Sequence, residues 1–360
     1  MARQVAQVDV DLALSTDGEE KHLPRHGLLL GILVLALLVT IVVSLGVGAV
    51  GISARKLLLT LFGQDSLTAD QRIIVLSIRL PRILAAALVG GALSVSGLLF
   101  QGLFRNPLAD PYVIGSSGGA VLGASIGVFL LSSVSVAGFG ATALLAFVGA
   151  ASSITLVYAL ARVNGRTPVV TLLLAGFAVS TMLSYSSYFL EALDVGFGTG
   201  LRILASWLHG TIGQPTWGQL AIVTILFVVG FAASVPLARR LNTLSLGEEY
   251  ATHLGLHVQH TRIVVIVIGS LLTAAAVALG GLISFVGLIV PHMMRMVLGP
   301  DHTRLLPATA LAGAVFLLVA DTVARTIVAP AELSVGVLTA FIGGPFFLYL
   351  LRTTKQETLL

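Results

Sequence analysis

Long stretches without a charged residue alternate with short polar stretches along the chain. Residues 27–50 read GLLLGILVLALLVTIVVSLGVGAV, and about 20 consecutive apolar residues suffice to cross a bilayer. Similar stretches recur to the end of the chain, which favours membrane spans over a buried helix of a large soluble protein. The pattern predicts an all-α membrane protein with about ten transmembrane helices. The expected spans are 27–50, 81–104, 113–131, 139–161, 168–190, 219–238, 262–280, 282–298, 305–324 and 336–352.

Composition supports lipid as the natural solvent. Of the 360 residues, 56% are hydrophobic and 10% are charged, whereas soluble domains carry about 25% charged residues. The chain has no cysteine, which excludes disulfides, thiolate metal sites and cysteine nucleophiles. The net charge of +4 is small, and the arginines lie in short connecting segments rather than in one block, so no nucleic-acid partner is indicated.

The polar segments predict the topology. Residues 1–26 resemble a disordered cytoplasmic tail more than a signal peptide, which would start with basic residues and have a shorter apolar stretch. Residues 27–352 form one transmembrane domain, and residues 353–360 form a second cytoplasmic tail. Lys and Arg are more abundant on the side of the two termini, which therefore is expected to be cytoplasmic. The outer loop 51–80 departs from this trend because it is basic.

Glycine recurs every fourth residue in the third expected span. The four residues are Gly115, Gly119, Gly123 and Gly127. Small residues let membrane helices approach closely. We expect this span to pack between neighbouring helices, although small residues are also common in membrane helices generally.

The charged residues that enzymes and ion-coupled transporters need are scarce. A phosphate-binding P-loop requires Gly-Lys-Ser/Thr, and none of the three lysines lies in that motif. We therefore predict no enzymatic activity and no cofactor for this chain. Asp321 and Arg325 have i,i+4 spacing and are expected to form a structural ion pair, with a proton relay as the alternative. His253 and His257 share that spacing, but without a third ligand they favour a solvated face over a metal site.

The polar segment 239–261 contains a possible short helix outside the membrane. Ser245 and Glu248 fit the S-x-x-E capping box, and Gly255 fits a position just past a helix end. These residues predict a cytoplasmic helix over about 246–254. It is either a solvated loop helix or a lever that a partner protein pushes.

Four long motifs carry a family resemblance. Residues 79–120, RLPRILAAALVGGALSVSGLLFQGLFRNPLADPYVIGSSGGA, closely resemble the signature region of the FecCD family, the permeases of iron-siderophore, haem and cobalamin importers. So do LGEEYATHLGL (246–256), GGLISFVGLIVPHMMRMVLGPDHTRLLPATALAGAVFLLVADTVAR (280–325) and PAELSVGVLTAFIGGPFFLYLL (330–351). Together they cover essentially the whole chain after residue 27.

This resemblance implies the permease architecture of a type II ABC importer in the cytoplasmic (inner) membrane of a prokaryote. The implied partners are a second permease copy, two ATP-binding subunits that hold ATP and Mg²⁺, and a substrate-binding protein that docks from outside.

The resemblance also implies roles for individual residues. Arg79, Arg82 and Arg325 match arginines that receive glutamates of the substrate-binding protein, and anchoring to lipid headgroups is the alternative for the first two. Asn106 and Leu108 match positions near the cytoplasmic gate. Segment 241–258 matches the coupling helices that contact the ATPase. The coupling residues are Ser245, Leu246, Gly247, Glu248, Glu249, Ala251, Leu254 and Gly255.

The predicted function is permease of an ATP-driven importer for an iron chelate, either a ferric siderophore or haem. Cobalamin is the alternative cargo, although the segment Thr167–Val170 is more apolar than its counterpart in cobalamin importers. An ion-coupled secondary transporter would need mid-span carboxylates. A membrane enzyme would need a constellation of catalytic polar groups. Neither is visible in the sequence.

Overall fold

The computed structural model describes residues 23–48, 50–61, 67–131, 133–162, 167–193, 199–329 and 331–357. Within them, seven helices are long and apolar enough to span a membrane: His26–Gly46, Ala69–Phe104, Ala141–Ala161, Val169–Ala192, Trp217–Ser245, Val258–Gly280 and His302–Thr326. Three shorter apolar helices are Ser116–Phe129, Val286–Leu298 and Val335–Leu350. These ten helices correspond in order to the ten predicted spans. The expected N-terminal tail lies outside the described residues up to position 22, and the expected C-terminal tail begins inside the last helix.

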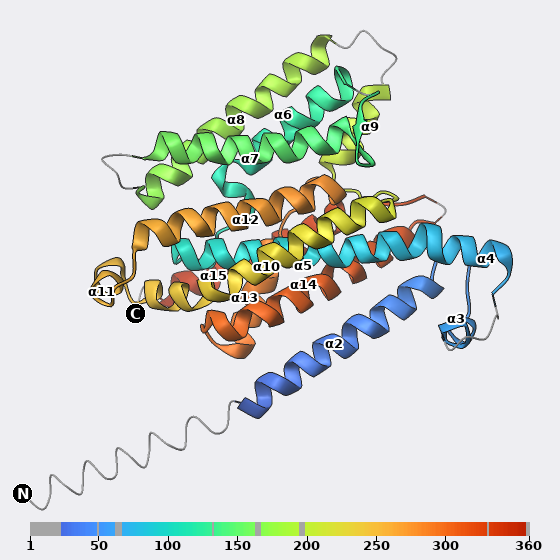
Figure 1. The fold of residues 1–360 in the computed structure, drawn as a ribbon, viewed down its shortest axis with the longest axis horizontal. Coiled ribbons are helices and arrows are strands. Elements are labelled where there is room, and N and C mark those ends of the chain that lie inside the picture. Colours follow the sequence, from blue (N-terminus) through green and yellow to red (C-terminus); the bar gives the residue numbers. More distant parts are fainter. Residues whose placement is uncertain are drawn as a thin grey trace, which may run out of the picture.

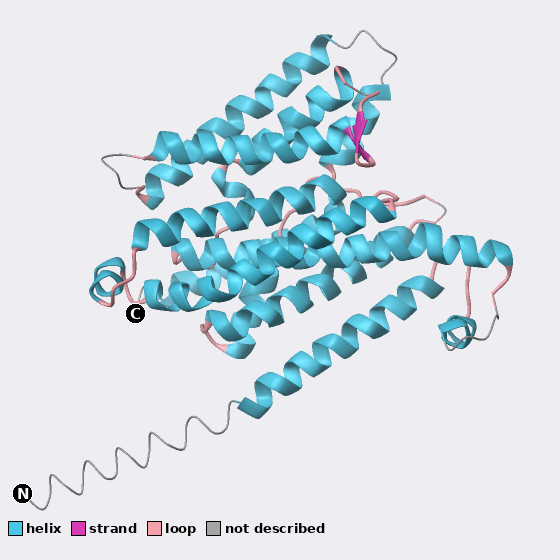
Figure 2. Ribbon diagram, in the orientation of Figure 1, coloured by secondary structure: helices cyan, strands magenta, loops and turns pink. Residues whose placement is uncertain are grey.

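Helices make up nearly all of the described structure, with one small β-hairpin (Figures 1 and 2). The long elements are α2 (Leu23–Gly46), α5 (Leu80–Phe104), α6 (Ser116–Phe129), α7 (Ala141–Ala161), α8 (Val169–Leu193), α10 (Trp217–Ser245), α12 (Val258–Gly280), α13 (Val286–Leu298), α14 (His302–Thr326) and α15 (Val335–Glu357). The short elements are α3 (Ala54–Leu61), α4 (Ala69–Ile73), the π-helix η1 (Ile74–Arg79), the 3₁₀-helix η2 (Pro111–Ile114), β1 (Ser135–Val136), β2 (Phe139–Gly140), α9 (Thr199–Leu208) and α11 (Glu248–His253). We call the two ends of the bundle the α4 end and the α11 end.

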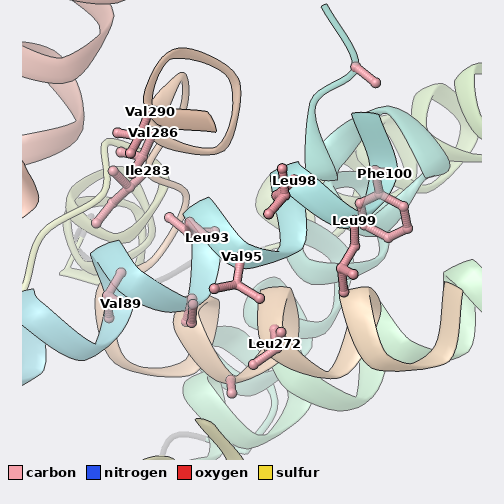
Figure 3. Packing of buried hydrophobic residues seen from close by; sticks show 14 of the residues in the cluster. Val89, Leu93, Val95, Leu98, Leu99, Phe100, Leu272, Ile283, Val286 and Val290 are labelled. Carbon is pink, nitrogen blue, oxygen red and sulfur yellow. The ribbon is translucent and has the colours of Figure 1, made fainter. Parts of the chain in front are cut away.

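Helix α5 is the centre of the bundle (Figure 1). Helices α10, α12, α13 and α14 pack against it, while α2 lies outside against α14. Helices α6, α7 and α8 form a second layer that meets the first through α7 and α12. Figure 3 shows Leu93, Val95 and Leu99 of α5 among buried side chains of α12 and α13. The most apolar part of α5 is 83% buried, against 6% for α2, so α2 is a lipid-facing helix and α5 is a core helix.

The second span extends well before the expected residues 81–104. Elements α4, η1 and α5 form one continuous helix of 36 residues, about 54 Å long at 1.5 Å per residue. A hydrocarbon core is about 30 Å thick, so the helix projects beyond the membrane at the α4 end. The segment 51–80, which was expected to form an outer loop, is largely helical, because α3, α4 and η1 occupy most of it; its place on the outer side stays a prediction.

The glycine face of the third span packs as predicted. A side chain at Gly119 would collide with the backbone of Gly149 on α7, and one at Gly149 would collide with Gly119. Gly123 and Gly127 approach the α7 backbone in the same way. Helix α6 therefore touches α7 backbone to backbone, which is how small residues associate helices in lipid.

A buried glutamine repairs the break that proline makes in α13. Pro291 has no N–H to donate to the carbonyl four residues earlier, that of Gly287. Gln101 of α5 donates its Nε2 to the carbonyls of Gly287 and Leu288 at 3.3 and 3.1 Å, and its Oε1 accepts from Arg295 at 3.0 Å. Backbone groups in a membrane must be satisfied internally, so Gln101 fixes α13 to α5.

Candidate functional site

Four charged side chains meet at the α4 end. Arg82 donates from Nε and Nη2 to Asp321 Oδ1 at 3.2 and 3.1 Å, and from Nη1 to Glu332 Oε2 at 2.7 Å. Arg325 lies 3.0 Å from the second oxygen of Asp321 and donates to Ser44 of α2 at 2.7 Å. We call Arg82, Asp321, Arg325 and Glu332 the Arg82 cluster. It connects α2, α5 and α14 with the segment before α15.

The Arg82 cluster is largely buried and formally neutral. Asp321 is 1% exposed, and the side chains of Arg82 and Arg325 are 10% and 7% exposed. Two arginines face two carboxylates, so their formal charges cancel. The predicted ion pair between Asp321 and Arg325 is confirmed. Glu332, with its side chain 52% exposed, is the member that meets solvent.

Arg79 lies apart from the Arg82 cluster. It is 6% exposed and donates to the carbonyls of Leu45 and Val50 at 2.6 and 2.5 Å. These carbonyls belong to the end of α2 and the residues just after it, so Arg79 holds that end against the second span. The structure thus gives each predicted docking arginine acceptors within the chain. Docking itself stays a prediction.

The segment between α10 and α12 differs from the expected capping box. Ser245 is the last residue of α10 and donates to the carbonyl of Asn242 at 2.7 Å. The helix cap is Gly247 at φ +115°, and α11 begins at Glu248, so the predicted helix over 246–254 is shorter. Glu248 pairs with Arg262 at 2.6 Å instead of reaching back to the cap. The capping box was therefore wrong, because the turn closes through a glycine that adopts a positive φ.

The far end of α11 follows the sequence pattern. Gly255 has φ +81°, and the N–H of Leu256 bonds to the carbonyl of Ala251, which closes the helix as predicted. Ala251 is fully buried beneath the helix, whereas Tyr250 and Leu254 are 69% and 67% exposed. An aromatic and an aliphatic side chain exposed on one short polar helix are typical of a protein contact.

The predicted gate residues lie at the same end of the bundle. Helix α5 ends at Arg105 in the left-handed region, with φ +49°. The side-chain oxygen of Asn106 then accepts from the N–H of Leu108 at 2.9 Å. Asn106 is exposed and Leu108 is partly exposed. The geometry is a tight polar turn, and its role in gating stays a prediction.

An ionised carboxylate fixes the start of α14 at the α11 end of the bundle. Asp301 accepts from the backbone N–H of Thr303 at 2.9 Å and from Asn242 of α10 at 2.6 Å. Burial alone would raise the pKa of Asp301, but these hydrogen bonds and the charge of Arg304 together lower it below its usual value. The carboxylate therefore stays charged at neutral pH and ties α10, just before α11, to α14.

Helix α8 presents hydroxyl groups that the sequence analysis did not single out. Tyr185 and Tyr188 are 68% and 60% exposed within the chain, and the segment STMLSYSSYF at 180–189 is rich in hydroxyls. Thr181, Ser186 and Ser187 donate to carbonyls of α8 itself, so the two tyrosines are the polar side chains that this segment presents outward. That cluster of hydroxyls inside an expected span was the signal that could have identified this surface.

Comparison with known proteins decides the family. The profile of the FecCD transport family matches residues 36–353. The chain belongs to the FecCD transport family. It is 46% identical to the cobalamin import system permease protein BtuC of Halobacterium salinarum over 80% of this chain and 76% of that protein. It is 39% identical to the hemin transport system permease protein HmuU of Yersinia pestis over 92% of this chain and 97% of that protein.

A solved structure agrees with this assignment. A protein described as an inward-facing metal-chelate type ABC transporter matches with a TM-score of 0.78 and 32% identity, covering 91% of this chain and 99% of that one. This FecCD member is thus a multi-pass permease subunit of an ABC importer in the inner membrane. The ATPase and the substrate-binding protein are separate partners.

Proposed function

We propose that the chain pairs with a second copy and carries an iron chelate, haem or a ferric siderophore, toward the cytoplasm. The main support is the family match together with relatives named for such cargo, the hemin permease and the Fe(3+) dicitrate permease FecD of Escherichia coli. FecD is 41% identical over 77% of this chain and 85% of that protein. Cobalamin is the second candidate, because the archaeal cobalamin permease is 46% identical.

The surface of α8 supports pairing around a central path. Its most apolar part is only 17% buried within the chain, and it presents Tyr185 and Tyr188 besides Phe177 and Phe189. Aromatic rings with a polar tip suit a surface that is apolar on one side and wet on the other. Such a surface fits a wide path between two copies, whose walls release a large chelate because they bind it weakly.

The α11 end is proposed to be cytoplasmic and to receive the ATPase. Both described ends of the chain, at α2 and α15, lie toward this end of the bundle (Figure 1), and the excess of Lys and Arg belongs to the same side. The exposed Tyr250 and Leu254 give α11 a contact surface. ATP-driven closure of the two ATPase subunits then moves α11 and rocks the two permeases.

The decisive test is reconstitution of the purified permease in liposomes. We expect no ATP hydrolysis by the permease alone, because the chain lacks Gly-Lys-Ser/Thr. Hydrolysis and uptake should arise together when the ATPase and the substrate-binding protein are added. Uptake by the permease alone under a proton or sodium gradient would support the secondary transporter and contradict this proposal. Competition among haem, a ferric siderophore and cobalamin for the binding protein then identifies the cargo.

Docking of the substrate-binding protein is expected to depend on Glu332. This carboxylate occupies Arg82 Nη1 and is half exposed, so an incoming glutamate must displace it. Exposed ion pairs contribute about 0.2–1 kcal/mol, so Glu332→Gln should tighten docking by up to about fivefold and steepen its salt dependence. Asp70→Asn, a change of another exposed acid at this end, is the control. Unchanged docking of the Glu332 variant, measured by surface plasmon resonance, would assign Arg82 a structural role only.

A further inference from the structure

One buried arginine connects the proposed ATPase contact with the start of α8. Arg262, in the first turns of α12, is 5% exposed. Its Nη2 donates to Glu248 Oε1 on α11 at 2.6 Å, and its Nη1 donates to the backbone carbonyl of Thr167 at 2.7 Å. Thr167 lies two residues before the first residue of α8. A single planar guanidinium therefore holds both elements with separate nitrogens, a rigid fork that a lysine ammonium does not have.

A second side chain from α12 fixes the same residue. Gln259 donates its Nε2 to Thr167 Oγ1 at 3.0 Å and to the hydroxyl of Tyr158 on α7 at 3.1 Å. Thr167 is fully buried, so its carbonyl and its hydroxyl are both held by the first turns of α12. The N-terminal end of α8 thus follows any displacement of the α11–α12 corner.

Across the space beside Arg262, this link is the direct connection between α11 and the segment before α8. A cavity of about 810 Å³ lies between α11 and the start of α8, lined by Glu248, Glu249, Thr252, Pro168 and Gln259 among others. Because the two walls are separated there, side-chain packing cannot transmit motion across the cavity. Arg262 spans it with two short charge-assisted or backbone hydrogen bonds, and such bonds are stiff and directional.

The α8 side of the link is a body that can move as a unit. A side chain at Gly118 of α6 would collide with the backbone of Ser180 on α8, and α6 packs equally closely on α7. Helices α6, α7 and α8 form the layer that lies apart from α5 (Figure 1). A pull on Thr167 is therefore applied to a packed layer, and not to one loosely held helix.

We infer that Arg262 is a positioning residue that transmits displacement of α11 to α8 and its layer. This inference rests on the proposed function, in which α11 receives the ATPase and α8 lines the path. The planar fork of an arginine suits this place, because the two acceptors lie on two different elements.

The test compares variants of the complete transporter reconstituted with ATPase and substrate-binding protein. Arg262→Gln removes the charge pair and the fork, while Glu248 stays half exposed to water. We expect ATP hydrolysis to change by less than about twofold and transport per ATP to fall by about tenfold or more, as for the loss of charged hydrogen bonds. For Arg262→Lys, transport per ATP should lie between the values of the native protein and of Arg262→Gln. Arg304→Gln is the matched control, because Arg304 pairs with Asp301 at the start of its own helix. Transport per ATP in this variant should equal that of the native protein.

A second readout needs no ATPase. In the isolated permease, hydrogen exchange of the amides at 172–175, the first of which bonds to the carbonyl of Pro168, should speed up by about tenfold in Arg262→Gln, since local opening follows the lost bonds, and should not change in Arg304→Gln. If Arg262→Gln does not assemble, Glu248→Gln provides the transport measurement, with a smaller loss of coupling expected. Native transport per ATP in the assembled Arg262→Gln transporter, or in Glu248→Gln where that variant replaces it, would overturn the inference.

A separate variant tests the proposed contact between α11 and the ATPase. Tyr250→Ala changes the exposed tip of α11 and should weaken ATPase association. If association is unchanged, the proposed ATPase contact is wrong, while reduced transport per ATP in Arg262→Gln still supports the link. If association weakens but Arg262→Gln couples normally, the link alone is wrong.

Discussion

Replacing Asp321 by alanine is expected to lower the free energy of unfolding by about 3–5 kcal/mol, the cost of breaking a buried ion pair by removing one partner. The carboxylate is 1% exposed and lies between Arg82 and Arg325, whose side chains are 10% and 7% exposed. Without it, Arg325 keeps only hydroxyl and carbonyl acceptors, and Arg82 keeps only Glu332. Thermal unfolding of the purified permease in detergent measures the loss, which should also lower its amount in the membrane.

Two comparisons make this result specific. Asp70→Ala removes an exposed acid of α4 at the same end and should change stability by less than about 0.5 kcal/mol, as surface substitutions usually do. In an Arg325→Ala background, Asp321→Ala should cost much less, because residues in one network are not additive. Equal unfolding midpoints for Asp321→Ala and Asp70→Ala would show that the Arg82 cluster does not stabilise the bundle.

The spans could be predicted because lipid imposes a strong and local requirement. Each of the ten expected spans has a helix, and the glycine face of α6 packs on α7 as the four-residue spacing indicates. Among the shorter helices, α11 was predicted but α9 was missed. Helix α9 has Leu201, Leu204 and Leu208 at helical spacing, a signal that was available, but its apolar face is too short for a hydropathy pattern to stand out.

Side-chain partners were harder to predict than helices. The i,i+4 pair of Asp321 and Arg325 is encoded within one helix, so spacing sufficed. Arg82 reaches Asp321 across 239 residues of sequence, and Arg262 reaches Thr167 across 95, and no local pattern specifies such contacts. The capping box failed for the same reason. The motif at Ser245 is locally valid, but Ser245 is the last residue of α10, and Arg262 of the following long helix takes the glutamate.

Gly247→Pro is expected to separate ATPase binding from membrane folding. Gly247 has φ +115°, and its N–H bonds to the carbonyl of Leu244 at 3.1 Å. Proline fixes φ near −65° and has no N–H, so it violates both requirements, and such a conflict costs about 3 kcal/mol or more. The strain falls on the α10–α11 corner, whereas the spans keep their packing. Association with the ATPase should therefore weaken by at least about tenfold, the equivalent of about 1.4 kcal/mol.

The control for this substitution is Gly299→Ala, at another corner with a positive φ, +79°, where an added side chain meets open space. The alanine introduces backbone strain at the same end of the bundle but does not contact α11. ATPase association should therefore stay near the native value. For Gly247→Pro, the thermal midpoint of the isolated permease should remain close to native while transport is lost. If transport and association persist, the turn at Gly247 can be rebuilt without penalty, and α11 is not the element through which the ATPase drives the permease. If instead the midpoint collapses, the corner belongs to the folding core, and the expectation that its strain stays local is wrong.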